Sequence, residues 1–214
     1  MTDKVFDNNQ VVIAGEVVKD FEFSHDVFGE GFYILEVAVN RLSNSFDVIP
    51  LMISERLIDV KQSYVGRFIE VFGQFRSYNR HEENKNKLVL SVFVREVNLL
   101  ESADEIQRPN SIFLDGYICK EPVYRKTPLG REIADLLLAV NRPYGKSDYI
   151  PTIAWGRNAI RTSEFNIGTR VKVSGRLQSR EYNKKIDDEK YEERTAYELS
   201  ASMIDVVEES EGEE

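Results

Sequence analysis

Cysteine and histidine are scarce in this 214-residue chain, which contains one cysteine and two histidines. Cys119, His25 and His81 are far apart in the sequence, so they cannot form a disulfide framework or a zinc site with the usual ligand spacing. They also cannot supply the histidine-based sets that activate a serine or cysteine nucleophile. We therefore expect no metal, no cofactor and no enzymatic activity, and we expect Cys119 to be a small core residue in a reducing compartment.

Long hydrophobic runs are also missing, since no apolar segment approaches the ~20 residues of a membrane-spanning helix. The first ten residues, MTDKVFDNNQ, lack the basic and apolar segments of a secretory signal. We therefore expect a cytoplasmic protein with no membrane partner. With 42% hydrophobic and 30% charged residues, the chain can form one large or two small packed domains.

The net charge of −9 is unevenly distributed along the chain. Residues 1–105 contain 11 basic and 18 acidic residues, a net charge of −7. Residues 106–204 contain 17 basic and 13 acidic residues, a net charge of +4, and residues 205–214 contain six carboxylates. The mean charge therefore hides a basic segment that could attract a polyanion.

An internal repeat at an offset of 101 residues is the strongest pattern in the sequence. The segment AVNR at 38–41 recurs at 139–142, and Asp-x-Ile-Pro at 47–50 recurs at 148–151. One inserted residue then raises the offset to 102. Four glycines of the first repeat, Gly15, Gly29, Gly66 and Gly73, correspond to Gly116, Gly130, Gly168 and Gly175. Because glycines agree as well as apolar positions, chance similarity of two β-rich segments does not explain the repeat.

Each repeat predicts three strands, a short helix, and two further strands joined by a charged hairpin. The expected helices are at 56–64 and 157–165, and the hairpins at 78–87 and 181–195. This order within about 95 residues predicts an OB-fold, a five-stranded Greek-key barrel. The predicted fold class is therefore all-β, with two tandem OB-folds that each carry a short helix. The predicted domains are 1–105 and 106–204, joined by a connector near 101–110 and followed by an acidic tail, 205–214.

The second repeat resembles the bacterial single-stranded DNA-binding protein (SSB) family over nearly its whole length. The resemblance depends on four segments taken together, DGYICKEP, LLLAVNR, DYIPTIAWGRNA and GTRVKVSGRLQSREY. It implies an OB-fold that wraps single-stranded DNA by aromatic stacking, in DNA replication, recombination or repair on the nucleoid. It also implies an assembly of four OB domains, which a tandem protein reaches as a homodimer.

Two candidate stacking rings alternate along the third strand of the second repeat. Tyr149 and Trp155 fall on one face with Pro151 and Ile153, whereas the small apolar set of Ile150, Thr152 and Ala154 suits a barrel interior. The alternative is that the rings fill the barrel or a subunit contact. The resemblance favours DNA, because it implies base-stacking aromatics at Tyr144, Tyr149, Trp155 and Tyr182.

Candidate phosphate contacts lie next to these rings. Arg176, Gln178, Arg180 and Tyr182 recur at every second position of the fourth strand, although charged residues also commonly protect exposed strand edges. Arg142 and Arg157 are further candidates. Arg41 and Arg56 repeat them in the first repeat, so a structural role for Arg142 and Arg157 stays equally open.

The first repeat keeps the frame of the second but not its rings. Ser43, Val48 and Ser54 stand at the positions of Tyr144, Tyr149 and Trp155. Among its remaining candidates are Phe46, Arg76 and Tyr78. We expect this acidic repeat to serve mainly as scaffold and dimer partner.

Four other functions are consistent with parts of the sequence. They are a primosome or mobile-element accessory protein, an RNA-binding OB module, an OB-fold nuclease, and a purely structural protein. The nearest acidic cluster for a metal nuclease, Asp187-Asp188-Glu189, falls among lysines in an expected hairpin. The chain ends in DVVEESEGEE, without the flexible linker and apolar tip of the resembled family, so we do not expect it to recruit replication proteins through such a tip.

Overall fold

The computed structural model describes residues 8–41, 43, 45–82, 85–185 and 191–208. The first seven residues, the acidic end of the tail from 209 and the cluster at 187–189 lie outside this range. Within it, no helix is long and apolar enough to cross a membrane. Strands dominate the described chain, as the sequence predicts.

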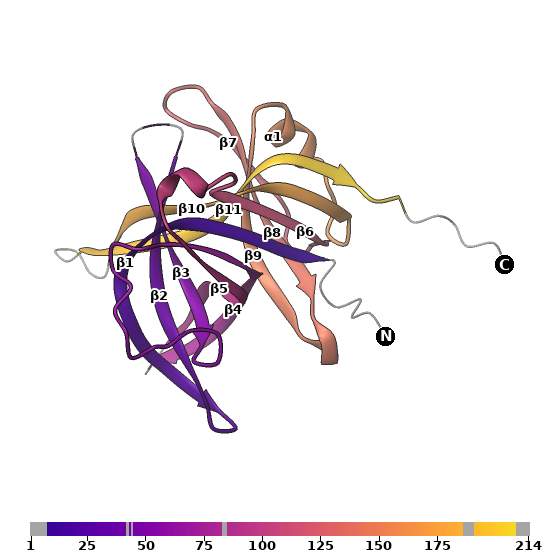
Figure 1. The fold of residues 1–214 in the computed structure, drawn as a ribbon. Helices are drawn as coiled ribbons and strands as arrows, with labels where there is room; N and C mark the ends of the chain where they lie inside the picture. The colour runs from indigo at the N-terminus through magenta and orange to yellow at the C-terminus, as the bar shows by residue number, and fades with distance from the viewer. Residues whose placement is uncertain (1–7, 42, 44, 83–84, 186–190, 209–214) are drawn as a thin grey trace. The chain divides into compact units, whose positions relative to one another are not determined.

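The first five strands close one barrel (Figure 1). They are β1 (Asn9–Val27), β2 (Glu30–Asn40), β3 (Phe46–Ser54), β4 (Phe68–Glu82) and β5 (Lys85–Leu100). β1 pairs with β2 and β4, β2 pairs with β3, and β4 pairs with β5, all antiparallel. A parallel pairing of β3 with β5 completes the circle. This is the OB-fold arrangement that the sequence predicts.

Five of the remaining strands close a second barrel in the same order. The strands after β5 are β6 (Asn110–Ile118), β7 (Val123–Lys126), β8 (Glu132–Asn141), β9 (Ser147–Trp155), β10 (Arg170–Lys185) and β11 (Tyr191–Val206). The barrel runs β6–β8–β9–β11–β10 and back to β6, with β9 and β11 parallel. β7 lies outside this barrel and pairs with β8. The sequence analysis did not predict this strand.

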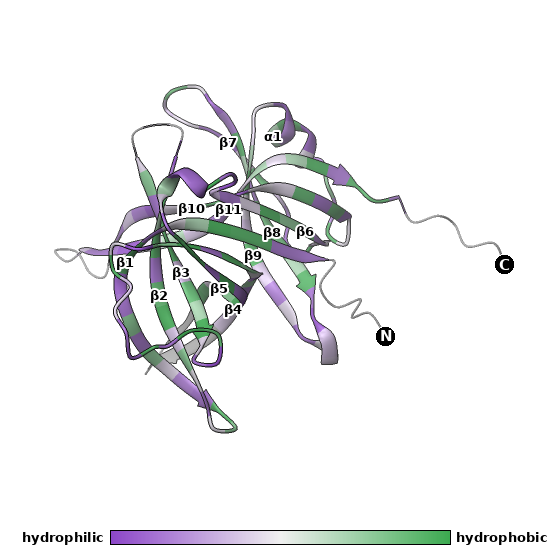
Figure 2. Ribbon diagram, in the orientation of Figure 1, coloured by the Kyte–Doolittle hydropathy of each residue, from purple (hydrophilic) through white to green (hydrophobic). Residues whose placement is uncertain are grey.

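The barrel interiors are filled by the apolar residues of each strand, and Figure 2 shows green and purple alternating along strands of both barrels. The alternation follows from the period of two in a strand, which points successive side chains to opposite faces. Ten interior residues, one from each barrel strand, are completely buried: Ile13, Val37, Leu51, Val71, Val92, Leu114, Leu138, Ile150, Val173 and Leu199.

The repeated glycines are required where two strands approach closely. A Cβ atom on Gly73 would lie 2.3 Å from the carbonyl oxygen of Phe93, and one on Gly175 would lie 2.1 Å from that of Ser200. No real Cβ fits at such distances, so both barrels need glycine at this position of the fourth strand. The agreement of these glycines in the repeat therefore reflects the same backbone contact, made twice.

The helical segments differ between the barrels. α1 (Arg157–Thr162) follows β9, within the range predicted for the second repeat. The helix predicted at 56–64 is wrong, because residues 55–67 form turns and irregular backbone. The described residues also contain the 3-10 helices η2 (Ala103–Glu105), in the predicted connector, and η3 (Pro143–Gly145), between β8 and β9.

The last two strands are longer than predicted, and they are shared between two compact units. The first unit contains Val11–Ser111 and Leu177–Glu198, and the second contains Met1–Gln10, Ile112–Arg176 and Leu199–Glu214. The outer half of the β10–β11 hairpin therefore groups with the first barrel. Compact units and sequence repeats are thus different divisions of the chain, and the domain limits 1–105 and 106–204 stay predictions.

Within the first unit, hydrogen bonds connect residues 177–179 of β10 to Arg41, Asp47 and Asn110. The Asp47 carboxylate accepts from the Ser179 amide at 2.7 Å, and the Ser179 carbonyl accepts from Arg41 at 3.1 Å. The Asn110 side chain both donates to and accepts from the Leu177 backbone, at 2.7 and 2.8 Å.

Candidate nucleic-acid interface

The two rings of β9 lie on the outer face of the second barrel. Tyr149 is 45% exposed and Trp155 is 36% exposed. Ile150, Thr152 and Ala154, which alternate with them, are at most 2% exposed. The predicted division of this strand into an apolar interior face and an outer face with rings is therefore what the structure has.

The Trp155 ring has a fixed orientation on this face. Its Nε1 donates a hydrogen bond to Ser200 Oγ of β11 at 3.0 Å, and its backbone is paired with that of Ile133 on β8. Ile153 shares the face but is only 5% exposed, and its backbone is paired with Asp135 on β8 and Ser200 on β11. The indole is thus held across neighbouring strands and still presents part of its surface to solvent.

Tyr144 occupies a turn between β8 and β9 and is 99% exposed. Its backbone is left-handed, with φ 63° and ψ 32°, a conformation that non-glycine residues seldom adopt. An exposed aromatic side chain gains nothing from packing, and backbone strain of this kind clusters at ligand-binding sites. The turn therefore presents a ring that is open to stacking on both faces.

Arg142 forms an ion pair with Asp148, with 3.1 Å between Nε and Oδ2. Arg41 and Asp47 form the same pair in the first barrel, where Arg41 Nε donates to Asp47 Oδ2 at 2.8 Å. Both aspartate side chains are 1% exposed. In each barrel, the arginine of the AVNR segment therefore forms a salt bridge with the aspartate of the Asp-x-Ile-Pro segment and joins the ends of two strands. This gives Arg142 a structural role. Phosphate contact by Arg142 stays a prediction.

Asp47 shows how strongly this frame holds a buried charge. Burial acts to raise the pKa of its carboxyl, but hydrogen bonds from Arg41 and Ser179 outweigh burial, and the pKa lies below its ordinary value of 3.8. The carboxylate is therefore ionised at neutral pH although its side chain is buried.

The row predicted on β10 is only partly exposed. Gln178 is 8% exposed and donates to Glu198 Oε1 at 2.6 Å, so the prediction of a continuous exposed row is wrong at this position. Arg176 is half-buried and belongs to the second unit. Arg180 and Tyr182 are exposed and belong to the first unit, with the guanidinium 5.7 Å from the ring centroid. Arg180 also lies 3.9 Å from Glu198, which reduces its attraction for a phosphate.

Arg157 is the first residue of α1 and is exposed. The short helix is held against β11, because Asn158 donates to the Ser202 carbonyl at 3.3 Å and Arg161 to the Ile204 carbonyl at 3.1 Å. Arg157 therefore extends from a fixed support in the unit that also carries Tyr144, Tyr149 and Trp155.

Comparison with known proteins gives a consistent result. Residues 109–207 match the Single-strand binding protein family. Single-stranded DNA-binding protein 3 of Clostridium acetobutylicum is 35% identical over 89 residues, which cover 38% of this chain and 62% of that protein. Single-stranded DNA-binding protein B of Bacillus subtilis is 35% identical over 80 residues, which cover 34% of this chain and 71% of that protein. The chain belongs to the single-strand binding protein family.

The whole fold has a counterpart among solved structures of the same family. The wild-type single-stranded DNA-binding protein from Thermus aquaticus superposes with a TM-score of 0.73, covering 96% of each chain at 19% sequence identity. This likeness extends over both barrels and concerns the fold. The curated relatives, by contrast, match about a third of this chain, and the chain covers 62% of the length of the Clostridium protein.

Ser200 belongs to the candidate site of this SSB-family chain, and sequence analysis missed it. Its hydroxyl orients the Trp155 indole, but the two residues are separated by 45 positions. The only signal available was the OB-fold strand order, which makes the third and fifth strands of each repeat parallel neighbours. Without a register, that order does not reveal which residue of the fifth strand lies beside Trp155.

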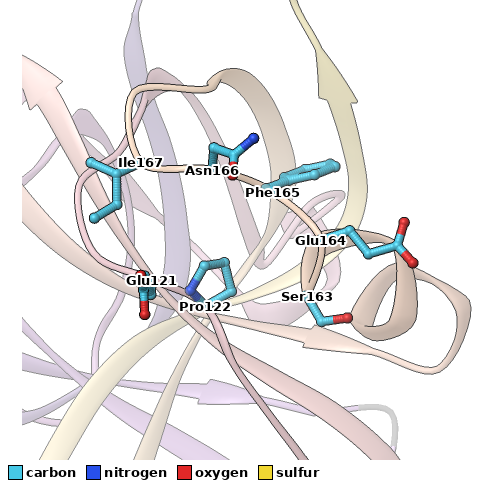
Figure 3. Close-up of a pocket in the computed structure, with 7 residues that line it drawn as sticks. All are labelled: Glu121, Pro122, Ser163, Glu164, Phe165, Asn166 and Ile167. Carbon is cyan, nitrogen blue, oxygen red and sulfur yellow. The ribbon is translucent and has the colours of Figure 1, made fainter.

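A pocket of about 350 Å³ opens elsewhere on the second unit, beyond α1 (Figure 3). Its walls are Glu121, Pro122 and residues 163–167, and it includes none of the predicted site residues. Two of its side chains, Glu121 and Glu164, are acidic, which is unfavourable for phosphate binding.

Proposed function

We propose that this protein binds single-stranded DNA without reading its sequence and protects it during replication, recombination or repair. The role is binding alone, without catalysis. The rings that stack on bases are Tyr144, Tyr149, Trp155 and Tyr182. The cations that contact phosphates are Arg142, Arg157, Arg176 and Arg180.

One observation carries this proposal: Tyr149 and Trp155 are exposed on the outer face of β9. Large rings are normally used to fill cores, where their apolar area is most stabilising. Exposed rings beside cations are what a protein needs to bind a strand through the π-faces of its bases and the charge of its backbone.

Two kinds of contact contribute to the expected affinity. Stacking contributes about 1–3 kcal/mol per base, and phosphate contacts add a contribution that falls as salt rises. A homodimer with four OB domains would gain further through effective concentration, provided that one strand spans both chains. A cytoplasmic, nucleoid-associated location goes with this function.

The test uses the single tryptophan, Trp155, whose emission reports on one stacking position. Thymidine oligomers should quench it strongly, and added salt should reverse the quenching. Matched RNA oligomers test DNA preference, since the 2′-hydroxyl changes the fit. Emission that does not respond to either polymer would contradict the proposal. A primosome or mobile-element role would instead be indicated by capture of a helicase or relaxase.

A further inference from the structure

The β1–β2 hairpin projects from the first barrel and ends in an exposed aromatic ring (Figure 1). Val27 is paired with Glu30, so Phe28 and Gly29 alone form the turn, and both have positive φ, 52° and 81°. Turns of this kind favour Asn-Gly, because a bulky side chain is strained there. The Phe28 ring is 101% exposed and contributes no packing to the fold. Its backbone and its exposure both indicate a contact outside the chain.

The equivalent hairpin of the second barrel, formed by β7 and the start of β8, also has an exposed apolar tip. The repeat offset of 101 places Leu129 at the position of Phe28, and Leu129 is 84% exposed. The residue that follows it, Gly130, has a φ of 77°, like Gly29. A large apolar side chain therefore lies in water at both hairpin tips, where polar residues are the usual choice.

A second exposed ring occupies equivalent positions of the two hairpins. Phe23 is 60% exposed and Tyr124, at the same offset of 101, is 39% exposed. Phe23 packs edge-on against Tyr33 of β2, with 5.5 Å between centroids, and the Tyr124 hydroxyl donates to Glu132 of β8 at 3.1 Å. The adjacent strand thus supports each ring and leaves part of it exposed. Exposed apolar side chains with charged neighbours are typical of protein contacts.

The two hairpins have opposite charges at these equivalent segments. Residues 22–30 contain three carboxylates and no lysine or arginine, a net charge of −3. Residues 123–131 contain three basic residues and no carboxylate, a net charge of +3. The charged residues are Glu22, Asp26 and Glu30 in the first segment, and Arg125, Lys126 and Arg131 in the second. The hairpins therefore share their apolar positions and are electrostatically complementary.

Neighbouring residues neutralise part of this charge but not the part closest to the tips. The ion pairs are Glu22–Lys19, Glu30–Arg56, Arg125–Asp135 and Lys126–Glu132. Asp26 and Arg131 form no ion pair among the described residues. Each lies two positions from its exposed tip residue, Phe28 or Leu129. A negative charge therefore accompanies one apolar tip and a positive charge accompanies the other.

We propose that the hairpin of residues 22–30 docks on the hairpin of residues 123–131 of a second copy of this chain. Phe28 and Leu129 would bury their apolar surface in the contact, and Asp26 would face Arg131. The partner is another copy because the chain itself carries both complementary surfaces, whereas two like hairpins would bring equal charges together. The two surfaces differ, so the contact can repeat from copy to copy. It is proposed in addition to the homodimer described above.

The first test measures self-association of the full chain in the absence of DNA, by sedimentation velocity over a range of protein concentrations. At low salt the wild type should form species larger than its basal assembly. Salt at about 1 M should dissociate them, because the Debye length then falls to about 3 Å. A sedimentation coefficient that depends on neither concentration nor salt would overturn the inference.

A pair of charge-reversal variants identifies the two surfaces. Glu22→Lys/Asp26→Lys and Lys126→Glu/Arg131→Glu each reverse the sign of one hairpin, so each variant alone should associate at least about tenfold more weakly. An equal mixture should regain association, because every hairpin of one variant then meets an oppositely charged hairpin of the other. The reversals change the net charge of the chain from −9 to −5 and to −13, so overall attraction does not explain recovery. A mixture that stays dissociated while the wild type associates would contradict the proposed pairing.

Matched variants separate the hairpin contact from general surface effects. Phe28→Ser and Leu129→Ser should each weaken association about 10- to 100-fold, as expected for a large apolar side chain that is buried in the contact. Phe46→Ser removes a ring that is 60% exposed outside the hairpins and should have no effect. Asp59→Lys/Asp104→Lys makes the same change in net charge as Glu22→Lys/Asp26→Lys at other exposed positions, and should also have none. Equal losses in these controls would overturn the inference.

The phosphates of DNA are the alternative partner of the basic hairpin. If Lys126→Glu/Arg131→Glu lowers affinity for thymidine oligomers and leaves self-association unchanged, this hairpin contacts DNA and the inference is wrong. Quenching of Trp155 by short oligomers should be the same in Phe28→Ser as in the wild type, because Phe28 belongs to the other unit. Failure of the copy-to-copy contact would therefore leave the proposed function intact.

Discussion

The indole Nε1 of Trp155 donates a hydrogen bond to the Ser200 hydroxyl at 3.0 Å. This bond joins two parallel strands that are distant in sequence, and it satisfies the polar atom of a ring that would otherwise be free to rotate. A ring whose orientation is fixed before binding loses less conformational entropy when a base stacks on it. The relationship therefore links the barrel topology to the proposed binding function.

The rings of β9 should contribute separately to affinity. Trp155→Ala and Tyr149→Ala should each weaken binding of a thymidine oligomer by about 1–3 kcal/mol, because each removes one stacking surface. Fluorescence anisotropy of a labelled oligomer measures both variants. Val48→Ala, the equivalent change to Tyr149→Ala in the first barrel, is the control and should have little effect. Equal losses in all three variants would argue that the barrel fold, and not the rings, was affected.

Loss of the Ser200 hydroxyl should weaken binding less than loss of the indole. Ser200→Ala leaves the ring in place but frees its orientation, so we expect a decrease of about 1 kcal/mol, the size of one hydrogen bond. Emission anisotropy of Trp155 in the unbound protein should also fall as the ring becomes mobile. Ser202→Ala is a control on the same strand, since the Ser202 hydroxyl donates to the Ser174 carbonyl and not to the indole. Unchanged anisotropy in Ser200→Ala would show that packing alone holds the ring.

The sequence was sufficient to predict both barrels because the repeat preserved the residues that the fold requires. Gly73 and Gly175 sit where a neighbouring carbonyl leaves no room for Cβ, and the Arg41–Asp47 and Arg142–Asp148 pairs close equivalent strand ends. Such residues are constrained by local geometry and so recur at fixed offsets. The rings Tyr149 and Trp155 were also predictable, because a strand's period of two separates its faces.

Features that depend on contacts between distant strands were not predictable. Phe32 of β2 stacks on Phe93 of β5 only because β2, β3 and β5 are in register, whereas the aligned repeats show only that Ser54 replaces a ring. The prediction of a helix at 56–64 was wrong, and this segment forms turns. Its polar residues occur in turns as well as in helices, so their spacing did not distinguish the two. Gln178 was expected to be exposed but is buried against Glu198, a residue of the neighbouring strand.

Arg142 and Arg157 are both proposed to contact phosphate, but their loss should differ in its effect on stability. Arg142→Ala removes the cation paired with Asp148, whose side chain is 1% exposed, and should lower the free energy of unfolding by about 3 kcal/mol. Arg157→Ala, at an exposed position, should change it by less than about 0.5 kcal/mol but lower the salt dependence of DNA binding by about one contact. Urea unfolding and salt titrations measure the two effects. An Arg142→Ala protein of normal stability with reduced salt dependence would show that Arg142 acts mainly on phosphate.

The buried Asp47 carboxylate should make the first unit sensitive to acid. Its folded-state pKa lies below 3.8, so its ionised form stabilises the fold at neutral pH, and this contribution is lost as the pH falls below 3.8 and the group is protonated. Asp47→Asn should therefore lower the free energy of unfolding by about 2 kcal/mol at pH 7, through loss of the charged hydrogen bonds from Arg41 and Ser179. The difference in the free energy of unfolding between wild type and variant should stay constant down to about pH 5 and become smaller at lower pH.

Asp59→Asn is the control, because that carboxyl also has a lowered pKa but is fully exposed, and it should show no comparable difference. Denaturant unfolding at pH 7, 5 and 3 measures the difference, and a gap of the same size at pH 3 would mean that Asp47 stabilises the unit through its shape and not its charge.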